Sequence, residues 1–265
     1  MSDLFKKIGV HTVAQEGNTL TTDNLAMETV VKLSDQEGVF TTLLATPTDL
    51  PELLIGHCIT EGYGLPPGAK IEVTVSEEGY KVQAIEHTVN EIGKSRSNQI
   101  VSTSCGACNS PGVEHLLDLL PTYTGTHTII DLNWLNQSFE IMKAMQIGFS
   151  KTGGMHAAGL FSFEGEGPIV CEDIGRHNAV DKAVGTRASL GQNWADTVLL
   201  LSGRCGWDIV AKSARAGIGT IACVGACSTL AAETARALGM RIFSFVKPHR
   251  SIGIGYIQPA MKDNP

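Results

Sequence analysis

Residues 197–226 read TVLLLSGRCGWDIVAKSARAGIGTIACVGA, and this stretch decides the fold class. It opens with an apolar run, continues with the helical pattern WDIVAKSARA, which Gly217 ends, and closes with a second apolar run that begins near Gly219. Near-continuous apolar strands that alternate with helices are typical of a mainly parallel sheet covered on both faces. The stretch therefore predicts an α/β unit.

The same alternation extends on both sides of this stretch. Downstream, the pattern predicts a helix over STLAAETARAL, residues 228–238, and a strand over RIFSFVK, residues 241–247. Upstream, it predicts a helix over 132–149, two strands within 155–175, and a helix over about 178–190. Because sites in such sheets lie beyond the carboxyl ends of the strands, the candidate site segments are SGRCG, VGACS and VKPHR.

The first hundred residues predict a small α+β domain. VFTTLLAT, residues 39–46, is typical of a strand, and a helix follows with Asp49 as its cap and Gly62 as its end. Strong alternation on both sides of Glu77–Gly79 predicts a hairpin, whereas residues 1–38 predict no particular element. The domains expected from these patterns are a small α+β N-terminal domain at 1–100, a cysteine loop and linker at 101–125, and an α/β domain at 126–265.

The composition limits the classes of function. The chain has 265 residues, of which 43% are hydrophobic and 18% charged, as in ordinary soluble globular proteins. Its net charge of −7 argues against a broad nucleic-acid surface but leaves room for a local basic pocket. No apolar run approaches the roughly 18–20 residues that span a bilayer, and an odd number of cysteines suits a reducing compartment better than a disulfide framework. We therefore expect a cytoplasmic protein that binds neither membranes nor nucleic acid.

Cys105 and Cys108 stand two residues apart in STSCGACNS, residues 102–110. This spacing is found in redox dithiols, zinc sites and sulfur carriers. A zinc site needs two further ligands, and the second cysteine pair that could provide them begins at Cys223, inside a predicted strand, so no structural zinc is expected. Because Pro111 interrupts the chain before any helix, the pair fits an exposed loop that presents a sulfur atom to two partners in turn. A dithiol redox pair, or two incidental cysteines, are the alternatives.

Two further groups of polar residues stand where strands end. Arg176 and His177 begin a predicted helix within EDIGRHNAVDK, and there they suit an anion or a polar heterocycle, although charge at a helix start is often only capping. Arg204 follows two small residues that let backbone amides approach an oxyanion. Lys247, His249 and Arg250 form a small basic island in an acidic protein, for which ordinary solvated charge is the alternative. Their sequence context is VKPHR, residues 246–250.

Six motifs occur in one order, and together they resemble the formate dehydrogenase accessory sulfurtransferases, the FdhD family. The motifs are TSCGAC at 103–108, GGMHAA at 153–158, EDIGRHNAVDK at 172–182, LLLSGR at 199–204, SARAG at 213–217 and FVKP at 245–248. The resemblance implies a small α+β N-terminal domain followed by a cytidine-deaminase-like, three-layer α/β domain. It also implies a homodimer.

The resemblance implies a sulfurtransferase reaction as well. Cys105 would take a persulfide sulfur from a cysteine desulfurase, with Cys108 assisting. The acceptor would be the molybdenum (or tungsten) bis-molybdopterin guanine dinucleotide cofactor, bound as a substrate before it enters formate dehydrogenase. The residues carried over as contacts of that dinucleotide are Phe245, Val246, Lys247, Pro248, His249 and Arg250, joined by Arg204, Arg176 and His177.

The deaminase likeness does not extend to the chemistry. Zinc deaminases need H-x-E at one helix start and P-C-x-x-C at the next. Here His177-Asn178-Ala179 and Ser202-Gly203-Arg204-Cys205 stand at those places, without the glutamate and without the paired thiolates. No metal ligands are therefore expected. A non-catalytic cofactor-binding chaperone and a dithiol redox protein are the alternatives to a sulfur carrier.

Overall fold

The structure is a computed structural model that describes residues 4–66, 68–90, 117, 120–163, 167–192 and 196–257. The chain divides into two compact units. The first unit comprises Met1–Ser104, Met142–Ala158 and Ile169–Gln192, and the second comprises Cys105–Ile141, Gly159–Pro168 and Asn193–Pro265. The domain boundaries that the sequence suggests, near residues 100 and 126, stay a prediction.

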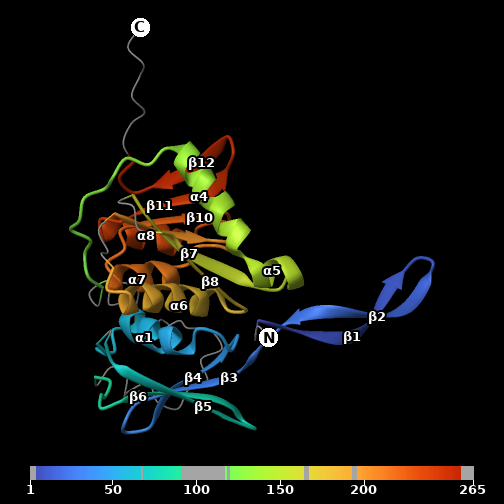
Figure 1. Cartoon of the computed structure of the whole chain (residues 1–265). Helices are drawn as coiled ribbons and strands as arrows, with labels where there is room; N and C mark the ends of the chain where they lie inside the picture. Colours follow the sequence, from blue (N-terminus) through green and yellow to red (C-terminus); the bar gives the residue numbers. More distant parts are fainter. Residues whose placement is uncertain are drawn as a thin grey trace. The chain divides into compact units, whose positions relative to one another are not determined.

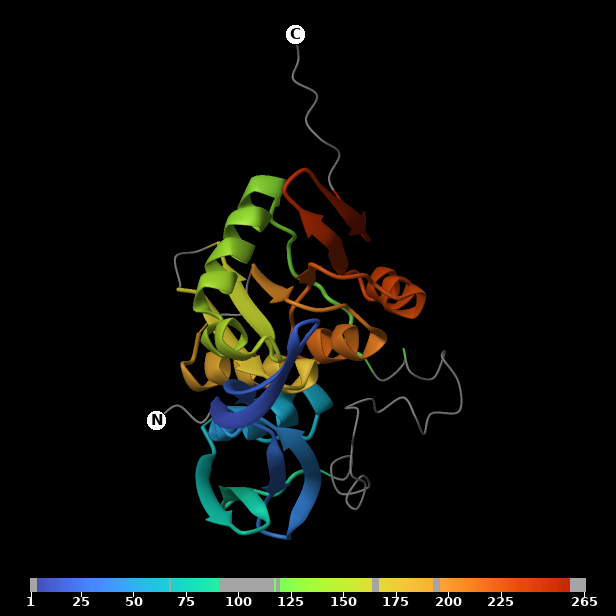
Figure 2. The ribbon, with the colours of Figure 1, turned by 90° about the vertical axis from the view of Figure 1, so that its right-hand side faces the viewer.

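The second unit contains the strands and helices predicted from residues 197–247. They are β9 (Thr197–Leu201), α7 (Trp207–Arg215), β10 (Thr220–Cys223), α8 (Thr229–Ala237) and β11 (Arg241–Lys247). The three strands are parallel, with Ile221 of β10 opposite Leu199 on one side and Ile242 on the other. Helix α4 (Leu132–Met145) lies on one face of these strands, and α7 and α8 lie on the other (Figure 2). This double cover explains why every residue of β9 is buried.

The larger sheet has six strands in the order β12-β11-β10-β9-β7-β8. The two strands predicted within 155–175 are β7 (His156–Ser162) and β8 (Ile169–Asp173). Strand β12 (Arg250–Ile254) was not predicted, and it pairs antiparallel with β11. Consequently VKPHR, the last of the candidate site segments, forms a tight turn in which Lys247 stands opposite Arg250.

A four-stranded sheet in the order β4-β3-β6-β5 forms part of the first unit. Its strands are β3 (Thr29–Ser34), β4 (Val39–Ala45), β5 (Lys70–Ser76) and β6 (Gly79–Ile85). The predictions of the strand at 39–46 and of the hairpin around Glu77–Gly79 are confirmed. The hydrophobic core of this region joins strand residues such as Val31 and Val82 to Leu53 and Leu54 of the neighbouring helix.

That helix, α1 (Leu50–Glu61), packs against α6 (Arg176–Ser189). It ends at Gly62 as predicted, with a φ of 74°, but the side chain of Asp49 caps nothing. Glycines allow the two helices to touch, since a Cβ on Gly56 would lie 1.7 Å from the carbonyl oxygen of Asp181. The buried residues of α1 include polar ones, among them His57 and Thr60. Asp181 of α6 accepts a hydrogen bond from the Thr60 hydroxyl and pairs with the His57 ring.

Residues 1–38, for which the sequence predicts no element, supply β3 and a separate hairpin. The hairpin consists of β1 (Phe5–Ala14) and β2 (Gly17–Ala26), paired in register along their whole length (Figure 1). Within the first unit it contacts the short helix α5 (Ile147–Thr152). No helix in the described ranges combines the length and the apolar character that crossing a bilayer requires.

Candidate functional site

The carboxyl ends of β9, β10 and β11 bring three loops of the second unit together. The amide of Gly225 donates to the carbonyl of Gly203 at 3.2 Å, and the amide of Phe245 donates to the carbonyl of Gly225 at 3.0 Å. The loops therefore continue the sheet as a short backbone ladder. We call residues 202–206, 224–228 and 245–250 the carboxyl-edge site.

Gly225 is the residue that lets these loops meet. A Cβ at this position would lie 2.8 Å from the carbonyl oxygen of Gly203 and 3.1 Å from the Cα of Arg204. Both contacts are with backbone atoms, which cannot move aside as the end of a side chain can. The structure thus places Arg204 and Phe245 in neighbouring loops, each next to Gly225.

Phe245 has an unusual backbone conformation, with a φ of 50°. A left-handed conformation is uncommon for a bulky residue and costs on the order of 1–3 kcal/mol, and such residues cluster at binding and catalytic sites. The register between β11 and β12 shifts between Ser244 and Lys247, around the same residue. The side chain of Phe245 is only partly buried, so the strain coincides with an aromatic ring at the edge of the site.

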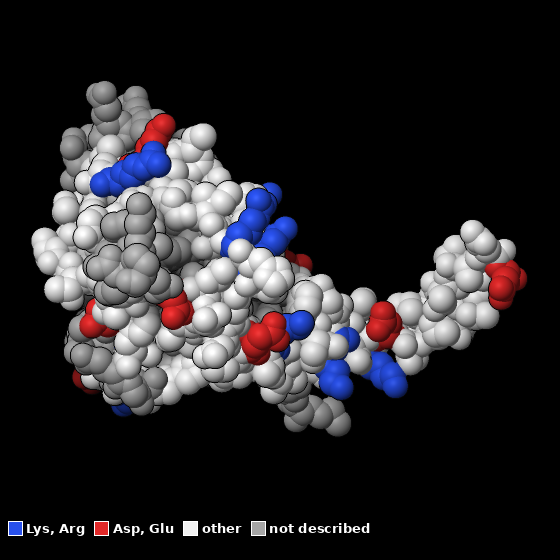
Figure 3. All heavy atoms as spheres, turned by 90° about the horizontal axis from the view of Figure 1, so that it is seen from above, with Lys and Arg blue, Asp and Glu red and all other residues white. Residues whose placement is uncertain are grey.

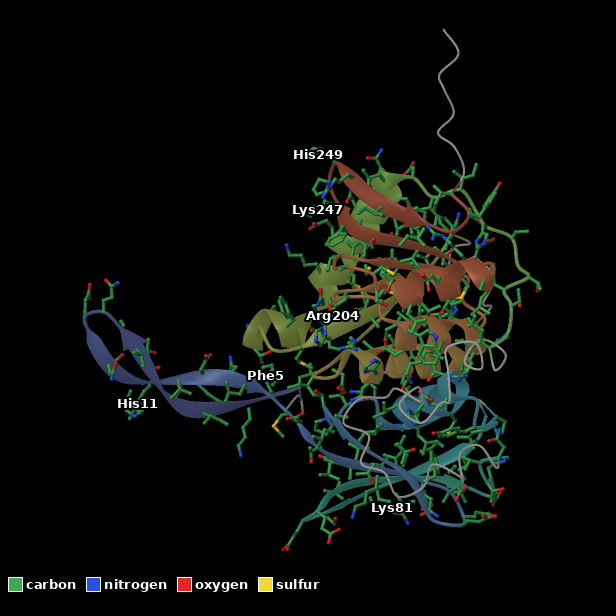
Figure 4. The ribbon with its side chains drawn as sticks, turned by 180° about the vertical axis from the view of Figure 1, so that it is seen from behind. Phe5, His11, Lys81, Arg204, Lys247 and His249 are labelled. Atoms are coloured by element: carbon green, nitrogen blue, oxygen red, sulfur yellow. The ribbon has the colours of Figure 1, made fainter. Side chains whose placement is uncertain are left out.

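Exposed basic side chains surround this edge. Arg204, Lys247, His249 and Arg250 are all exposed, and the first three lie along the same side of the second unit (Figure 4). The turn that carries Lys247, His249 and Arg250 is attached to α4, because the side-chain amide of Asn136 donates to the carbonyl of Pro248 at 3.2 Å. On the face seen from above, Lys and Arg form small separate groups rather than a continuous basic surface (Figure 3). A local anion is therefore the ligand that the charges suit.

Arg176 and His177 occupy the first turn of α6, in the first unit. His177 is buried, with 7% of its surface exposed, and Arg176 is partly buried. Because these two residues and the carboxyl-edge site belong to different units, their expected grouping around one ligand stays a prediction. The predicted site residues Cys105 and Cys108 lie outside the described residues.

Most carboxylates of EDIGRHNAVDK have structural partners. Asp173 pairs with Lys182 at 2.7 Å, and both side chains are fully buried. Glu172 accepts hydrogen bonds from the amides of Gly148 and Phe149, at 2.6 and 2.7 Å, and so satisfies the first turn of α5. For these carboxylates, capping and packing explain the polar string, and a ligand-binding role is not required.

Sequence reasoning gave little weight to two cysteines of the carboxyl-edge site and a third at the end of β10. Cys205 and Cys227 stand directly opposite each other in a parallel bridge between two loops. Cys227 is partly exposed, and its hydrogen bond with Cys205 lowers its pKa. Burial raises the pKa of the third thiol, Cys223, to about 12. No group of three or more His, Cys, Asp or Glu side chains suited to a metal occurs within the described part of the chain.

A cavity of about 380 Å³ lies elsewhere in the second unit and was not predicted. It is found at the carboxyl-terminal end of α7, where Ala214, Arg215 and Gly217 line it together with residues 121–125. The carboxyl-edge site adjoins the amino-terminal end of the same helix. The cavity is therefore separate from the site to which the sequence motifs point.

Comparison with known proteins places these features in a family. The sequence model described as the FdhD/NarQ family matches residues 26–253. The sulfur carrier protein FdhD of Thermoplasma acidophilum is 39% identical over 182 residues, which cover 66% of this chain and 63% of that protein. The protein of the same name in Thermoplasma volcanium is 35% identical, covering 81% and 79% of the two chains. The one in Anaeromyxobacter sp. strain K is 32% identical, covering 92% and 90%.

A solved structure supports the fold. A crystal structure from Desulfotalea psychrophila, described as that of a formate dehydrogenase accessory protein, superposes with a TM-score of 0.74 and covers 96% of this chain and 97% of its own. Its sequence identity is 21%, so the likeness concerns the fold alone. The predicted mixed α/β fold class is confirmed. Since the family model matches most of the length, and relatives above 30% identity match over most of both chains, the chain belongs to the FdhD/NarQ family.

Proposed function

We propose that this protein is a sulfur carrier in the maturation of formate dehydrogenase. Cys105 accepts a sulfur atom from a cysteine desulfurase and passes it to a molybdenum or tungsten bis-molybdopterin guanine dinucleotide, bound as the substrate. Relatives that share most of the chain are named sulfur carrier proteins. The structural observation that supports the proposal is the carboxyl-edge site, where a strained aromatic residue and exposed cations gather at the end of a parallel sheet.

The sulfur step is a thiolate displacement. The Cys105 thiolate attacks the outer sulfur of the desulfurase persulfide, the S–S bond of that persulfide breaks, and the desulfurase thiolate leaves. An ordinary cysteine with a pKa near 8.5 is only a few per cent thiolate at neutral pH. A fall in the pKa of about one to two units would make the thiolate abundant without much loss of nucleophilicity.

The carboxyl-edge site has the groups that a guanine dinucleotide requires. Arg204, Lys247 and Arg250 are exposed cations that suit a pyrophosphate. Helices α7 and α8 both begin at this edge, and the free amides of a helix start favour negative charge. The ring of Phe245 provides an aromatic face for a base. A homodimer in the cytoplasm completes the proposal.

The proposal predicts that Cys105→Ser abolishes formate dehydrogenase activity in cells that depend on this protein. The matched control is Asn109→Ala, four residues further along the sequence, which should retain activity. After incubation with a desulfurase and cysteine, mass analysis should find one added sulfur on the peptide that contains Cys105. Full activity of the Cys105→Ser, Cys108→Ser double variant would instead identify a cofactor-binding chaperone.

The nucleotide part predicts that GDP binds the protein and that Arg204→Ala and Lys247→Ala each weaken binding by about tenfold, as loss of one charge-assisted contact does. Titration calorimetry measures the affinity. Lys81→Ala removes a charge of the same sign from β6 in the first unit (Figure 4) and should leave the affinity unchanged. Equal affinities for all three variants would contradict the assignment of the carboxyl-edge site to the dinucleotide.

A further inference from the structure

Cys205 and Cys227 occupy equivalent places in two successive strand–loop–helix segments. Cys205 stands two residues before the first residue of α7, and Cys227 stands two residues before the first residue of α8. Because β9 and β10 pair in parallel, with Cys223 opposite Leu201 at their carboxyl ends, the two loops leave the sheet side by side. Neither cysteine has a part in the sulfur transfer proposed above.

The backbone holds the two cysteines in direct opposition. The amide of Cys205 donates to the carbonyl of Ala226 at 3.0 Å, and the amide of Ser228 donates to the carbonyl of Cys205 at 3.1 Å. These two bonds form the parallel bridge between Cys205 and Cys227. Paired strands lie about 4.8 Å apart, within the Cα separation of about 4.4–6.8 Å that a disulfide needs. The two thiols are close enough for each to shift the pKa of the other, and the Cys227 thiol donates to the carbonyl of Ser228 at 3.3 Å.

The environments of the two thiols differ in a way that separates their roles. Cys205 is buried, with 1% of its surface exposed, whereas Cys227 is partly exposed at the start of α8. Their hydrogen bond lowers the pKa of Cys227 and, together with burial, raises that of Cys205. Cys227 is therefore the thiol that an external reagent can reach, and Cys205 is positioned to react with it afterwards.

The third thiol of the cluster is not suited to this chemistry. Cys223 is fully buried at the end of β10, and its thiol donates to the carbonyl of Gly225 at 3.3 Å. In the register of the sheet it stands opposite Leu201, whereas Cys205 and Cys227 stand opposite each other. The reactive unit is thus a pair and not a triad.

We propose that Cys227 and Cys205 form a second dithiol site, which accepts the outer sulfur of a persulfide and releases it as sulfide. First, the Cys227 thiolate attacks the outer sulfur of a persulfide R–S–SH, the S–S bond breaks, and R–S⁻ leaves and takes up a proton. Cys227 now carries the persulfide.

In the second step, Cys205 attacks the Sγ of Cys227. The Cys205–Cys227 disulfide forms, the bond between Cys227 and the added sulfur breaks, and that sulfur leaves as HS⁻ with the proton of Cys205. The net reaction converts R–S–SH and two protein thiols into R–SH, one disulfide and H₂S. The two electrons that reduce the sulfur come from the two thiols.

This reaction supplies what a sulfur carrier for a metal centre lacks. The outer sulfur of a persulfide is two electrons more oxidised than the sulfide that a metal binds as a ligand, so its delivery requires a reductant. A dithiol at the carboxyl-edge site provides one. Its use during delivery rests on the proposed function, whereas its reaction with a small persulfide does not.

The experiment uses the full chain with Cys105→Ser and Cys108→Ser, which leaves Cys227 as the one partly exposed cysteine among the described residues. Glutathione persulfide is the probe, sulfide is measured by trapping with monobromobimane, and peptides are mapped by mass spectrometry. We expect one sulfide released per chain and a disulfide that joins the peptides of Cys205 and Cys227. Release without this disulfide would overturn the proposal.

Two further variants in the same background separate the steps. With Cys205→Ser, the persulfide should accumulate on Cys227 and sulfide release should fall by at least about tenfold, because the resolving thiol is absent. With Cys227→Ser, neither the persulfide nor the release should occur. The matched control, Cys223→Ser, removes the neighbouring buried thiol and should release sulfide as the parent does. Unchanged release from Cys227→Ser would refute the site.

Alkylation of the parent chain keeps the test independent of how the variants fold. Brief treatment with iodoacetamide at neutral pH should label Cys227 before Cys205 and Cys223, since only Cys227 is partly exposed. If Cys227 stays unlabelled in the folded chain, the proposal is wrong. Neither result changes the outcome expected for Cys105, so the two proposals fail separately.

Discussion

Phe245 and Gly225 show how single residues shape the carboxyl-edge site. Phe245 adopts a positive φ of 50° without being a glycine, and Gly225 leaves no room for a Cβ beside Gly203. Phe245 has a strained backbone, and Gly225 has no side chain to keep the loops apart. The two residues are joined by a backbone hydrogen bond. Because strained backbone conformations cluster at functional sites, the conformation of Phe245 supports a functional role for the carboxyl-edge site.

Buried thiols should make the stability of the protein sensitive to alkaline pH. Burial raises the pKa of Cys171 and of Cys223 to about 12, well above that of an ordinary cysteine. Above about pH 9 the unfolded chain loses these protons while the folded chain keeps them, so the free energy of unfolding should be full below pH 9 and fall between pH 9 and 12. Urea unfolding at pH 8 and at about pH 10.5 measures the loss. Cys171→Ala should reduce the pH dependence, and an unaltered dependence in that variant would count against this cause.

At the scale of elements, helices α1 and α6 also pack closely through glycines. Gly56 and Gly185 face each other's helix, and a Cβ on Gly185 would lie 1.9 Å from the carbonyl oxygen of Glu52. The close approach places Asp181 of α6 beside His57 and Thr60 of α1. Two small residues therefore allow both backbone contact and a buried polar network.

Gly56→Ala should destabilise the protein by about 3 kcal/mol, at the upper end of the cost of overpacking, because the new methyl would meet backbone atoms that cannot yield locally. Denaturant unfolding measures the difference. Gly68→Ala is the matched control, since a Cβ there meets nothing within 4 Å, and its midpoint should stay close to that of the parent. Equal midpoints for the two variants would show that α1 and α6 are further apart than described.

At the scale of the whole molecule, the segment outside the family match is also a segment that contributes little burial. The match runs from residue 26 to residue 253 and leaves out nearly all of the β1–β2 hairpin. That hairpin is mostly exposed, including Val13 at 76% and Leu20 at 74%. A two-stranded ribbon contributes little burial to the stability of the domain that carries it.

Removal of residues 1–25 should therefore change the melting temperature by no more than a few degrees, because little apolar surface is lost. Differential scanning calorimetry of the shortened and full chains measures the change. Formate dehydrogenase activity in dependent cells provides the functional readout, and we expect it to persist. Unfolding of the shortened chain would show that the contacts between the hairpin and α5 are structural.

The elements predicted from the sequence and those that were missed differ in a physical way. Buried strands such as β9 and helices that end at a glycine leave strong local patterns, and these were predicted. Strand β12 is a partly exposed edge strand after a tight turn, and β1 and β2 carry polar residues on both faces, so neither has the apolar alternation that marks a strand. The prediction that the Asp49 side chain caps α1 was wrong. Asp49 adopts a left-handed backbone conformation, and its side chain makes no capping hydrogen bond.

By itself, the sequence determined the α/β alternation, the family and the candidate segments at strand ends, because apolar runs, glycine stops and ordered motifs are local properties of the chain. Only the tertiary structure decided that Cys205 meets Cys227, that Gly225 joins Arg204 to Phe245, and that most carboxylates of EDIGRHNAVDK support the fold. These contacts depend on which strands pair and in which register. The pairing joins residues that are far apart along the chain, so no local sequence pattern predicts it.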